Sequence, residues 1–528
     1  MEVFFVVFSL IHSASVYGVD GKRISVEVDI ASGLPQVNIV GLPDPAVRES
    51  VERVRAALKN SGFTFPMDRI TVNLAPAVLR KEGTSFDLAI AAGILTASGQ
   101  IHAAPFQQTL LIGELSLDGS VQPVTGVLAM LEQAKHCGFT RVLLPYGNVK
   151  EAAWISGMEL FALSHLKELS PDSAKQNDWN HIRAASDDNM YEQNDQDGLA
   201  AMSQQEVGDY RDVIGQHQAK RAMLIAAAGK HNILLNGPPG TGKTMMIRRL
   251  PSILPLLNEQ EALEVTKIYS VAGKLNDSSS GLIRFPPFRA PHHTISTGGL
   301  IGGGTIPKPG EVTLAHRGVL FLDELPEFPR QVLEVMRQPL EDRIVTISRS
   351  KAVFQFPASL MLAASFNPCP CGYHGHEYGD KRCSCSSTVI SRYRSKISGP
   401  LLDRIDLHVE VPRPISLDNA KVGPSLTSDQ MRQMVLGAKA FQQARLADHG
   451  ALFNGELSGA VLRKTVNMKP EALNLLENAF NALGISMRAY DRILKLSRTI
   501  ADLGSSDAVE AEHVAEAIQY RSFDNQQP

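Results

Sequence analysis

The chain has 528 residues, of which 44% are hydrophobic, and it carries a formal net charge of -3 at pH 7. This length and composition allow several buried cores and predict about three domains. The small net charge excludes a globally basic nucleic-acid-binding protein, although it is compatible with a local basic surface. Four of the five cysteines are clustered, unlike the spread pairs of a secreted disulfide scaffold, so we expect a cytoplasmic protein.

The opening residues, MEVFFVVFSLIHSASVYGV, contain an apolar run without the positive start of a signal peptide. The run is too short to span a bilayer, so we expect a buried first strand and no association with a membrane. Residues 1–166 are predicted to form one α+β domain. The segment 167–212 is rich in Asp, Asn, Gln and Ser, which predicts a polar linker or a long surface excursion.

The strongest motif is GPPGTGKT, which follows a short apolar strand at 233–235 and precedes a helix. It matches the phosphate-binding loop in full and in the strand, loop and helix context that this loop requires. Backbone N–H groups would cradle the phosphates, Lys243 would reach the β- and γ-phosphates, and the Thr244 hydroxyl would hold Mg²⁺. The residues predicted to bind ATP and Mg²⁺ are Gly237, Pro238, Pro239, Gly240, Thr241, Gly242, Lys243 and Thr244.

Two more apolar strands are expected to end beside this loop. The strand at 319–322 is followed by Asp323, which can hold Mg²⁺, and by Glu324, which can polarise the attacking water. The strand in SLMLAASFN leads to Asn367, whose amide could orient that water against the γ-phosphate. The acidic pair therefore predicts hydrolysis as well as binding.

Three arginines downstream are candidates for the same chemistry. Arg404, at a strand entrance in SGPLLDRIDLHVEV, could stabilise transition-state charge in a neighbouring subunit's site. Arg488 and Arg492, in GISMRAYDRILKL, lie four apart on one helix face behind Ser486 as N-cap, and either could reach back to the phosphates. Surface ion pairs are the alternative for all three arginines.

Residues 213–411 are thus predicted to form an ATPase core with a parallel sheet, and residues 412–528 a helical domain. Helical periodicity takes over in this last region, where two apolar stripes predict a bundle. The stripes are Leu473, Leu476, Phe480 and Leu483, and Ile493, Leu496, Ile500 and Leu503. The predicted fold class is α/β, with an α+β domain before the core and helices after it.

Cysteines form two close pairs in a predicted insertion at 369–385. Four thiolates suffice for a closed tetrahedral Zn²⁺ site, with His374 and His376 as substitutes for a cysteine that does not bind. Each pair is spaced more tightly than is usual, so reduced thiols without metal are the alternative. The predicted zinc ligands are Cys369, Cys371, Cys383 and Cys385.

A basic run overlaps and follows these cysteines, with no acidic residue between 381 and 396. Such a run could follow a nucleic-acid backbone, with Tyr393 available for stacking on a base. A solvated basic face is the alternative. The cations of the run are Lys381, Arg382, Arg392, Arg394 and Lys396.

The order of these motifs resembles that of the AAA+ ATPases, in the branch of the magnesium-chelatase ATPase subunits. The stretch PFRAPHHTISTGGLIGGGTIPKPGEVTLAHRGVLFLDELPEF resembles the signature of that branch, and the whole chain resembles the bacterial ComM/YifB family. The resemblance implies a ring, expected to be a hexamer, because the arginine finger cannot complete its own chain's site. The roles it implies are Walker A for Lys243 and Thr244, Walker B for Asp323 and Glu324, sensor 1 for Asn367, arginine finger for Arg404 and sensor 2 for Arg488.

The same resemblance implies two insertions that line the pore of the ring. One is the Gly-rich loop at about 291–310, and the other is a hairpin at about 343–357 whose polar tip carries Arg349 and Lys351. Cations aimed into a channel would contact phosphates without reading bases. An ordinary hairpin with a charged turn is the alternative.

The N-terminal region resembles the proteolytic domain of Lon and a related domain of the RadA recombination ATPase. In KEGTSFDL, Ser85 stands where Lon has its nucleophile, but in TGVLAML the place of the base, a lysine in Lon, is taken by Leu128. A serine nucleophile needs a proton acceptor, so we expect a non-proteolytic scaffold or a module that contacts DNA.

Together these features predict an ATP-driven ring motor that acts on branched or single-stranded DNA. The family resemblance implies a branch-migration helicase that promotes recombination of DNA in natural transformation. The alternative is a chelatase-like ATPase that remodels a protein partner. A Lon-like protease is a third interpretation, which Leu128 disfavours.

Overall fold

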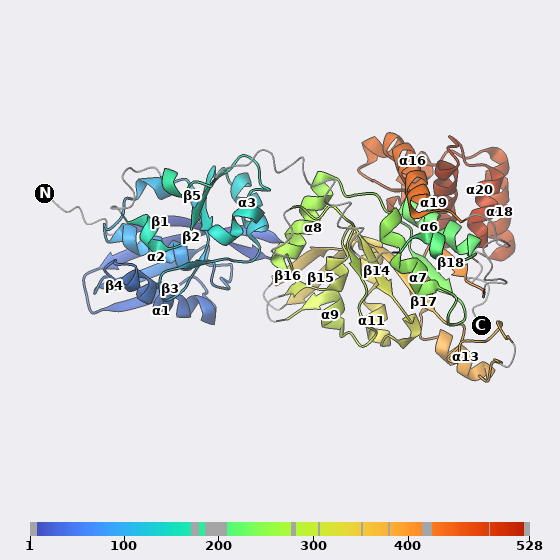
Figure 1. Ribbon diagram of the computed structural model, residues 1–528, viewed down its shortest axis with the longest axis horizontal. Helices are drawn as coiled ribbons and strands as arrows, with labels where there is room; N and C mark the ends of the chain where they lie inside the picture. Colours follow the sequence, from blue (N-terminus) through green and yellow to red (C-terminus); the bar gives the residue numbers. More distant parts are fainter. Residues whose placement is uncertain are drawn as a thin grey trace. The chain divides into compact units, whose positions relative to one another are not determined.

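The computed structural model describes residues 8–170, 179–184, 208–275, 281–304, 307–349, 352–378, 381–413, 425–484 and 486–521. The chain divides into two compact units, Met1–Asn194 with Thr266–Leu282, and Asp195–Val265 with Ile283–Pro528 (Figure 1). Among the described residues, no helix combines the length and hydropathy needed to cross a bilayer.

The first unit is built on a mixed seven-stranded sheet in the order β3-β4-β2-β1-β5-β8-β9. Its strands are β1 (Phe8–Tyr17), β2 (Asp20–Ala31), β3 (Gln36–Val40), β4 (Arg69–Ala75), β5 (Thr109–Leu111), β8 (Arg141–Pro145) and β9 (Glu159–Leu163). A first strand is present as β1, which pairs antiparallel with β2, Phe8 facing Asp29 and Tyr17 facing Asp20. It is only partly buried, because Phe8 and Leu10 are exposed, and residues 1–7 of the predicted apolar run lie outside the described residues. A small hairpin of β6 (Glu114–Leu115) and β7 (Val121–Gln122) lies outside this sheet.

Helices α1 (Pro45–Asn60), α2 (Asp87–Ala97), α3 (Val127–His136) and α4 (Val149–Ala152) complete this unit. Helix α2 is buried along its whole length and packs on β1 and β2, as expected for a segment that is apolar all round. Leu128, in the first turn of α3, is fully buried. An apolar core side chain therefore occupies the position at which the resemblance to Lon places a lysine.

Part of the expected linker belongs to the core of the first unit. The Trp179 ring packs edge-on against Phe106 and Phe161, with ring centroids 4.9 and 5.6 Å apart, and Ile182 is buried beside them. These isolated apolar residues in a polar stretch make no periodic pattern, so the sequence did not predict them as core. The rest of the stretch, 171–178 and 185–207, lies outside the described residues.

The second unit contains a parallel five-stranded sheet in the order β11-β14-β17-β10-β18. Its central strands are buried and mostly apolar, because helices or loops cover both faces of a parallel sheet. The strands are β10 (Ile233–Asn236), β11 (Phe288–Arg289), β14 (Val319–Leu322), β17 (Met361–Phe366) and β18 (Leu407–Glu410). Helix α6 (His217–Gly229) packs on β10 and β18, and α7 (Lys243–Arg248) on β17. The predicted α/β fold class, with an α+β domain, a parallel-sheet core and C-terminal helices, is confirmed.

Shorter elements surround this sheet. Two hairpins, β12 (Gly302–Gly303) with β13 (Lys308–Pro309) and β15 (Ile344–Arg349) with β16 (Ala352–Pro357), form separate ladders. The helices are α9 (Thr297–Ile301), α10 (Glu311–Leu314), α11 (Arg330–Glu334), α12 (Arg337–Asp342), α13 (Ser387–Arg394) and α14 (Gly399–Leu402). Helix α8 (Glu259–Val271) has residues in both units, because the first unit includes Thr266–Leu282.

The C-terminal helices are α16 (Ser428–Leu446), α17 (Gly459–Thr465), α18 (Pro470–Leu483), α19 (Met487–Leu503) and α20 (Ala511–Gln519), gathered into one group (Figure 1). The stripe of α19 is buried as predicted at Ile493, Leu496 and Ile500. The predicted apolar stripe of α18 is only partly buried, because Leu476 is buried whereas Leu473 is exposed. Ser486 caps α19 by accepting a hydrogen bond from Ala489 N, as predicted.

Candidate functional site

The predicted phosphate loop connects β10 to α7 at the carboxyl end of the parallel sheet. Gly240 and Gly242 have φ values of 78° and 88°, in the left-handed region that favours glycine. A Cβ atom at Gly237 would lie 2.2 Å from the Val411 carbonyl oxygen that follows β18. The loop therefore needs glycine both for its turns and for its close approach to the sheet.

Lys243 lies inside this loop and links it to the end of β17. Its Nζ donates to the carbonyl oxygens of Gly237 and Pro238, at 2.6 and 2.9 Å, and to Asn367 Oδ1, at 3.1 Å. Burial lowers the pKa of Lys243 to about 8. The structure thus brings together Lys243 and Asn367, which are 124 residues apart in the chain.

Thr244 and Asp323 meet at the end of β14. The Thr244 hydroxyl donates to Asp323 Oδ2 at 3.0 Å, and the other carboxylate oxygen accepts from Ser365 Oγ and from Glu324 N. A hydroxyl and a carboxylate oxygen in this position fit Mg²⁺, which prefers hard oxygen ligands. Thr244 and Asp323 would hold the ion, which when bound neutralises phosphate charge.

Glu324 has an exposed side chain and a left-handed backbone. Its φ of 55° is unusual for a residue other than glycine, and such conformations cluster at functional sites. Glu324 Oε2 lies 3.9 Å from Nδ1 of His293, which stacks on His292 with ring centroids 4.0 Å apart. The Glu324 carboxylate is thus placed beside a histidine that the sequence did not single out.

The predicted finger and sensor arginines lie together at Glu341, on α12. Arg404 forms an ion pair with the Glu341 carboxylate, and an Arg488 guanidinium nitrogen lies 3.5 Å from the same carboxylate. All three line a cavity of about 320 Å³, together with Arg492 and Lys495. Arg492 is bound differently, because it pairs with the buried Asp406.

This cluster lies at the amino end of the sheet strands, away from the phosphate loop. Asn232, the residue before β10, donates from Nδ2 to the Arg404 carbonyl oxygen at 2.9 Å. The loop begins only after β10, so the full length of that strand, on the order of 13 Å, lies between the two positions. Within this chain, neither Arg404 nor Arg488 reaches the phosphate loop.

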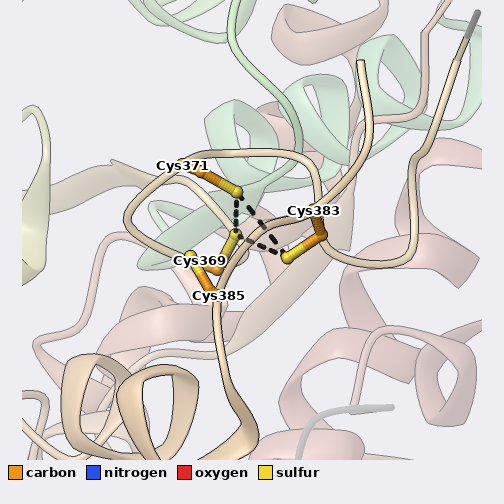
Figure 2. A group of neighbouring side chains, drawn as sticks. All are labelled: Cys369, Cys371, Cys383 and Cys385. Atoms are coloured by element: carbon orange, nitrogen blue, oxygen red, sulfur yellow. Dashed lines mark hydrogen bonds between the residues drawn. The ribbon is translucent and has the colours of Figure 1, made fainter. Parts of the chain in front are cut away.

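The four clustered cysteines converge in space (Figure 2). Their sulfur atoms all lie within 4.8 Å of one another, and Cys369 Sγ lies 3.3 Å from Cys371 Sγ and 3.8 Å from Cys383 Sγ. Tetrahedral Zn²⁺ with Zn–S distances of about 2.3 Å requires sulfurs separated by about 3.8 Å. The arrangement of Cys369, Cys371, Cys383 and Cys385 therefore fits one Zn²⁺ ion.

The two histidines proposed as substitutes are not part of this cluster. His376 Nε2 lies 3.1 Å from Glu410 Oε1, at the end of β18, and His374 is exposed. Although desolvation opposes the shift, hydrogen bonds from the Tyr373 backbone and from Cys369 lower the pKa of the Cys371 thiol to about 6, whereas desolvation and the contacts with Cys371 and Cys369 raise the pKa of Cys383 and of Cys385. A thiolate is the form of cysteine that binds metal.

Some residues of the basic run have partners within the chain. Arg394 Nε donates to the Pro368 carbonyl oxygen at 3.1 Å, and Lys396 Nζ lies 3.7 Å from a Glu327 carboxylate oxygen. Tyr393 is only 6% exposed, which corrects the expectation that it could stack on a base. The exposed cations of the run are Lys381, Arg382, Arg392 and Lys396, of which Lys381 lies over the Tyr373 ring.

The predicted hairpin is present as β15 and β16, paired antiparallel from Ile344 with Pro357 to Arg349 with Ala352. Arg349 Nη2 donates to the Gly304 carbonyl oxygen at 3.0 Å, so the hairpin contacts the predicted Gly-rich loop. Lys351, at the predicted tip, lies outside the described residues.

Sequence reasoning missed three contributors to this region: Ser365, His293 and Gly372. Ser365 carried a signal, because it is a polar residue in an otherwise apolar buried strand. His293 carried a weaker signal, as one of two adjacent histidines in PHHT. Gly372 carried no signal in the sequence, because it is needed for its close contact with Pro239, which is distant in the chain.

The parallel sheet, the phosphate loop and the acidic pair after β14 define a P-loop ATPase of the AAA class. Comparison with known families agrees. The family described as "Magnesium chelatase, subunit ChlI" matches residues 209–418, "Subunit ChlI of Mg-chelatase" matches 26–148, and "Magnesium chelatase, subunit ChlI C-terminal" matches 425–521.

Relatives match over almost the whole chain. The competence protein ComM of Haemophilus influenzae is 40% identical over 516 residues, covering 98% of this chain and 97% of ComM. YifB of Escherichia coli strain K12 is 38% identical over 517 residues, with the same coverage. Lon protease 2 of Bacillus subtilis is 28% identical over 179 residues, covering 30% of this chain and 32% of that protease. The chain belongs to the ComM/YifB family of Mg-chelatase-like ATPases.

Proposed function

We propose that the chain forms a ring, expected to be a hexamer, that hydrolyses ATP and moves DNA as a branch-migration helicase in recombination. The proposed ring is supported by one observation: Arg404 and Arg488 lie away from the phosphate loop of their own chain. The guanidinium groups of Arg404 and Arg488, at the opposite end of the sheet, can contact the phosphates of ATP only when that ATP is bound to an adjacent subunit. A repeated head-to-tail contact of this kind forms a ring when the rotation between neighbouring copies closes.

In the proposed site, Lys243 and Asn367 hold and orient the phosphates from one side. Glu324 accepts the proton of a water molecule that attacks the γ-phosphorus, and the bond to the bridging oxygen of the leaving ADP breaks. Arg404 of the adjacent subunit neutralises the charge that develops on the transferred group. Arg488 joins it from the same neighbour, since both arginines lie at Glu341.

DNA as the substrate is supported by the name of the competence protein relative and by exposed cations in the second unit. Arg349 on the hairpin, and Arg382 and Arg392 near the cysteines, are exposed. Cations of this kind would contact phosphates in any sequence, which suits a motor that moves along DNA.

The alternative is an ATPase that remodels a protein partner, which the magnesium-chelatase family descriptions favour. A four-way DNA junction with one labelled strand separates the two functions. We expect the purified chain with ATP to move the branch point, so that the labelled strand is released from the junction. We also expect DNA to stimulate ATP hydrolysis. ATP hydrolysis that is unaffected by DNA, without strand release, would contradict the DNA function.

We also propose that the cysteine cluster binds Zn²⁺ as a structural ion. The fit of four sulfurs to a tetrahedral site supports this assignment. Elemental analysis of the purified chain should find about one zinc per chain, and Cys383→Ser should lose most of it. A chain purified without zinc, or a variant that retains it fully, would contradict the assignment.

A further inference from the structure

The cysteine turn, residues 369–372, packs directly against the phosphate loop. Gly372 N donates to the Cys369 carbonyl oxygen at 2.9 Å, which closes the turn. A Cβ atom at Gly372 would lie 2.6 Å from Cδ of Pro239 and 3.1 Å from its Cγ. Gly372 is buried, with a φ of 86°. Only a residue without a side chain allows the two loops to come this close.

A second connection joins the same two loops through Asn367. The Asn367 amide accepts a hydrogen bond from Lys243 Nζ at 3.1 Å, and only Pro368 separates Asn367 from Cys369. The Pro368 carbonyl oxygen is held by Arg394 Nε at 3.1 Å. A shift of Cys369 would therefore displace Asn367, whose amide contacts Lys243. A shift of Gly372 would displace Pro239, at another point of the phosphate loop.

We infer that the cysteine turn couples metal binding to nucleotide binding, so that each ligand strengthens the binding of the other. Zn²⁺ held by Cys369 and Cys371 fixes the first and third residues of the turn, and the turn fixes Pro239 and Asn367 in the arrangement that receives phosphates. This inference rests on the proposed zinc and ATP sites, and it requires neither DNA nor a ring. By thermodynamic linkage, the factor by which zinc raises nucleotide affinity equals the factor by which nucleotide raises zinc affinity.

Zinc loss from the purified wild-type chain tests the coupling without preparing a metal-free protein. The chain is mixed with the chromogenic chelator 4-(2-pyridylazo)resorcinol in the presence or absence of AMP-PNP, and zinc transfer is followed by absorbance. At equilibrium, we expect saturating AMP-PNP to raise the affinity of the chain for zinc, read from the division of zinc between chain and chelator, on the order of tenfold, as is typical of coupled sites. The same division of zinc with and without nucleotide would overturn the inference.

Two glycines of the same insertion provide a matched pair of variants. Gly372 and Gly375 both have left-handed backbones, with φ of 86° and 76°, but a Cβ atom at Gly375 would meet nothing within 4 Å. Gly372→Ala and Gly375→Ala therefore introduce similar backbone strain, and only the first presses on Pro239. Both leave the four cysteines unchanged.

We expect Gly375→Ala to bind fluorescent mant-ATP as wild type does, and Gly372→Ala to bind it about tenfold more weakly while both retain zinc. Equal mant-ATP affinities in the two variants would overturn the inference. Elemental analysis and mant-ATP titration of the wild type distinguish failure of the coupling from failure of the proposed zinc and ATP sites. If zinc is absent, the zinc site and the coupling both fail, and if zinc and nucleotide bind independently, only the coupling fails.

Discussion

The Arg488 guanidinium lies 3.5 Å from the carboxylate of Glu341. Because Arg404 pairs with the same carboxylate, the two arginines form one cationic cluster at the amino end of the sheet strands. The phosphate loop lies at the other end of those strands. A single chain therefore has its phosphate-binding loop at one end of the sheet and its candidate finger and sensor arginines at the other end.

Arg488 and Arg492 lie on the same helix but should have different functions. Arg488 has a side chain that is 58% exposed, whereas Arg492 pairs with Asp406, whose side chain is 6% exposed. We expect Arg492→Ala to deprive the buried Asp406 carboxylate of its arginine partner and lower the free energy of unfolding by about 3–5 kcal/mol. Arg488→Ala should change it by less than about 0.5 kcal/mol but strongly reduce ATP hydrolysis. Thermal denaturation and ATPase assays check both, and equal destabilisation by the two substitutions would contradict this division.

The same ion pair predicts a pH dependence of stability. Burial alone would raise the pKa of Asp406, but Arg492 and His231 hold it well below its usual range. A carboxyl group with a lowered pKa stabilises the folded state above its unfolded pKa of about 3.9, and this contribution is lost as the pH falls further. Because the unfolded state is the same in both chains, the stability difference between wild type and Arg492→Ala should be largest at neutral pH and shrink as the pH falls through the pKa of Asp406 in the variant, which loss of the arginine raises. Denaturation in urea at several pH values would measure it, and a difference that does not change with pH would contradict the assignment.

Glu324→Gln should bind ATP and assemble as wild type does, yet not turn ATP over, because an amide cannot accept the proton of the attacking water. Glu327, exposed and three residues further on, provides the control, and Glu327→Gln should keep normal turnover. Phosphate release and mant-ATP binding measure the two properties separately. Normal turnover by Glu324→Gln would remove Glu324 from its proposed role.

Arg349→Ala should weaken DNA binding without lowering ATP hydrolysis in the absence of DNA. Each phosphate contact that is lost should reduce the slope of log affinity against log salt concentration by about 0.7 on single-stranded DNA, so the loss is larger the more chains of the ring contact the strand. Arg463, which is 60% exposed on α17, serves as the control cation. Fluorescence anisotropy with labelled single-stranded DNA between low and moderate salt checks this, and identical slopes for Arg349→Ala and Arg463→Ala would contradict a DNA contact at the hairpin.

How much of the site could be predicted depends on how local each feature is. The phosphate loop was predictable because GPPGTGKT is contiguous and lies between a strand and a helix, and the cysteine cluster because its ligands span few residues. The contact of Gly372 with Pro239 and the support of Asp323 by Ser365 depend on the order of strands in the sheet, which no local pattern specifies. The position of Arg488 depends on how the C-terminal helices pack on the core, so periodicity predicted its helix but not its partner.

The most direct test of the shared site mixes two variants that are each expected to be inactive. Lys243→Ala impairs the phosphate loop and keeps Arg404, whereas Arg404→Ala impairs the finger and keeps the loop. In a ring assembled from equal amounts of both, about a quarter of the interfaces combine an intact loop with an intact finger. We predict that the mixture regains about a quarter of wild-type ATP hydrolysis, a level that neither variant shows alone. A mixture that has no more activity than its two components would contradict an active site shared between subunits.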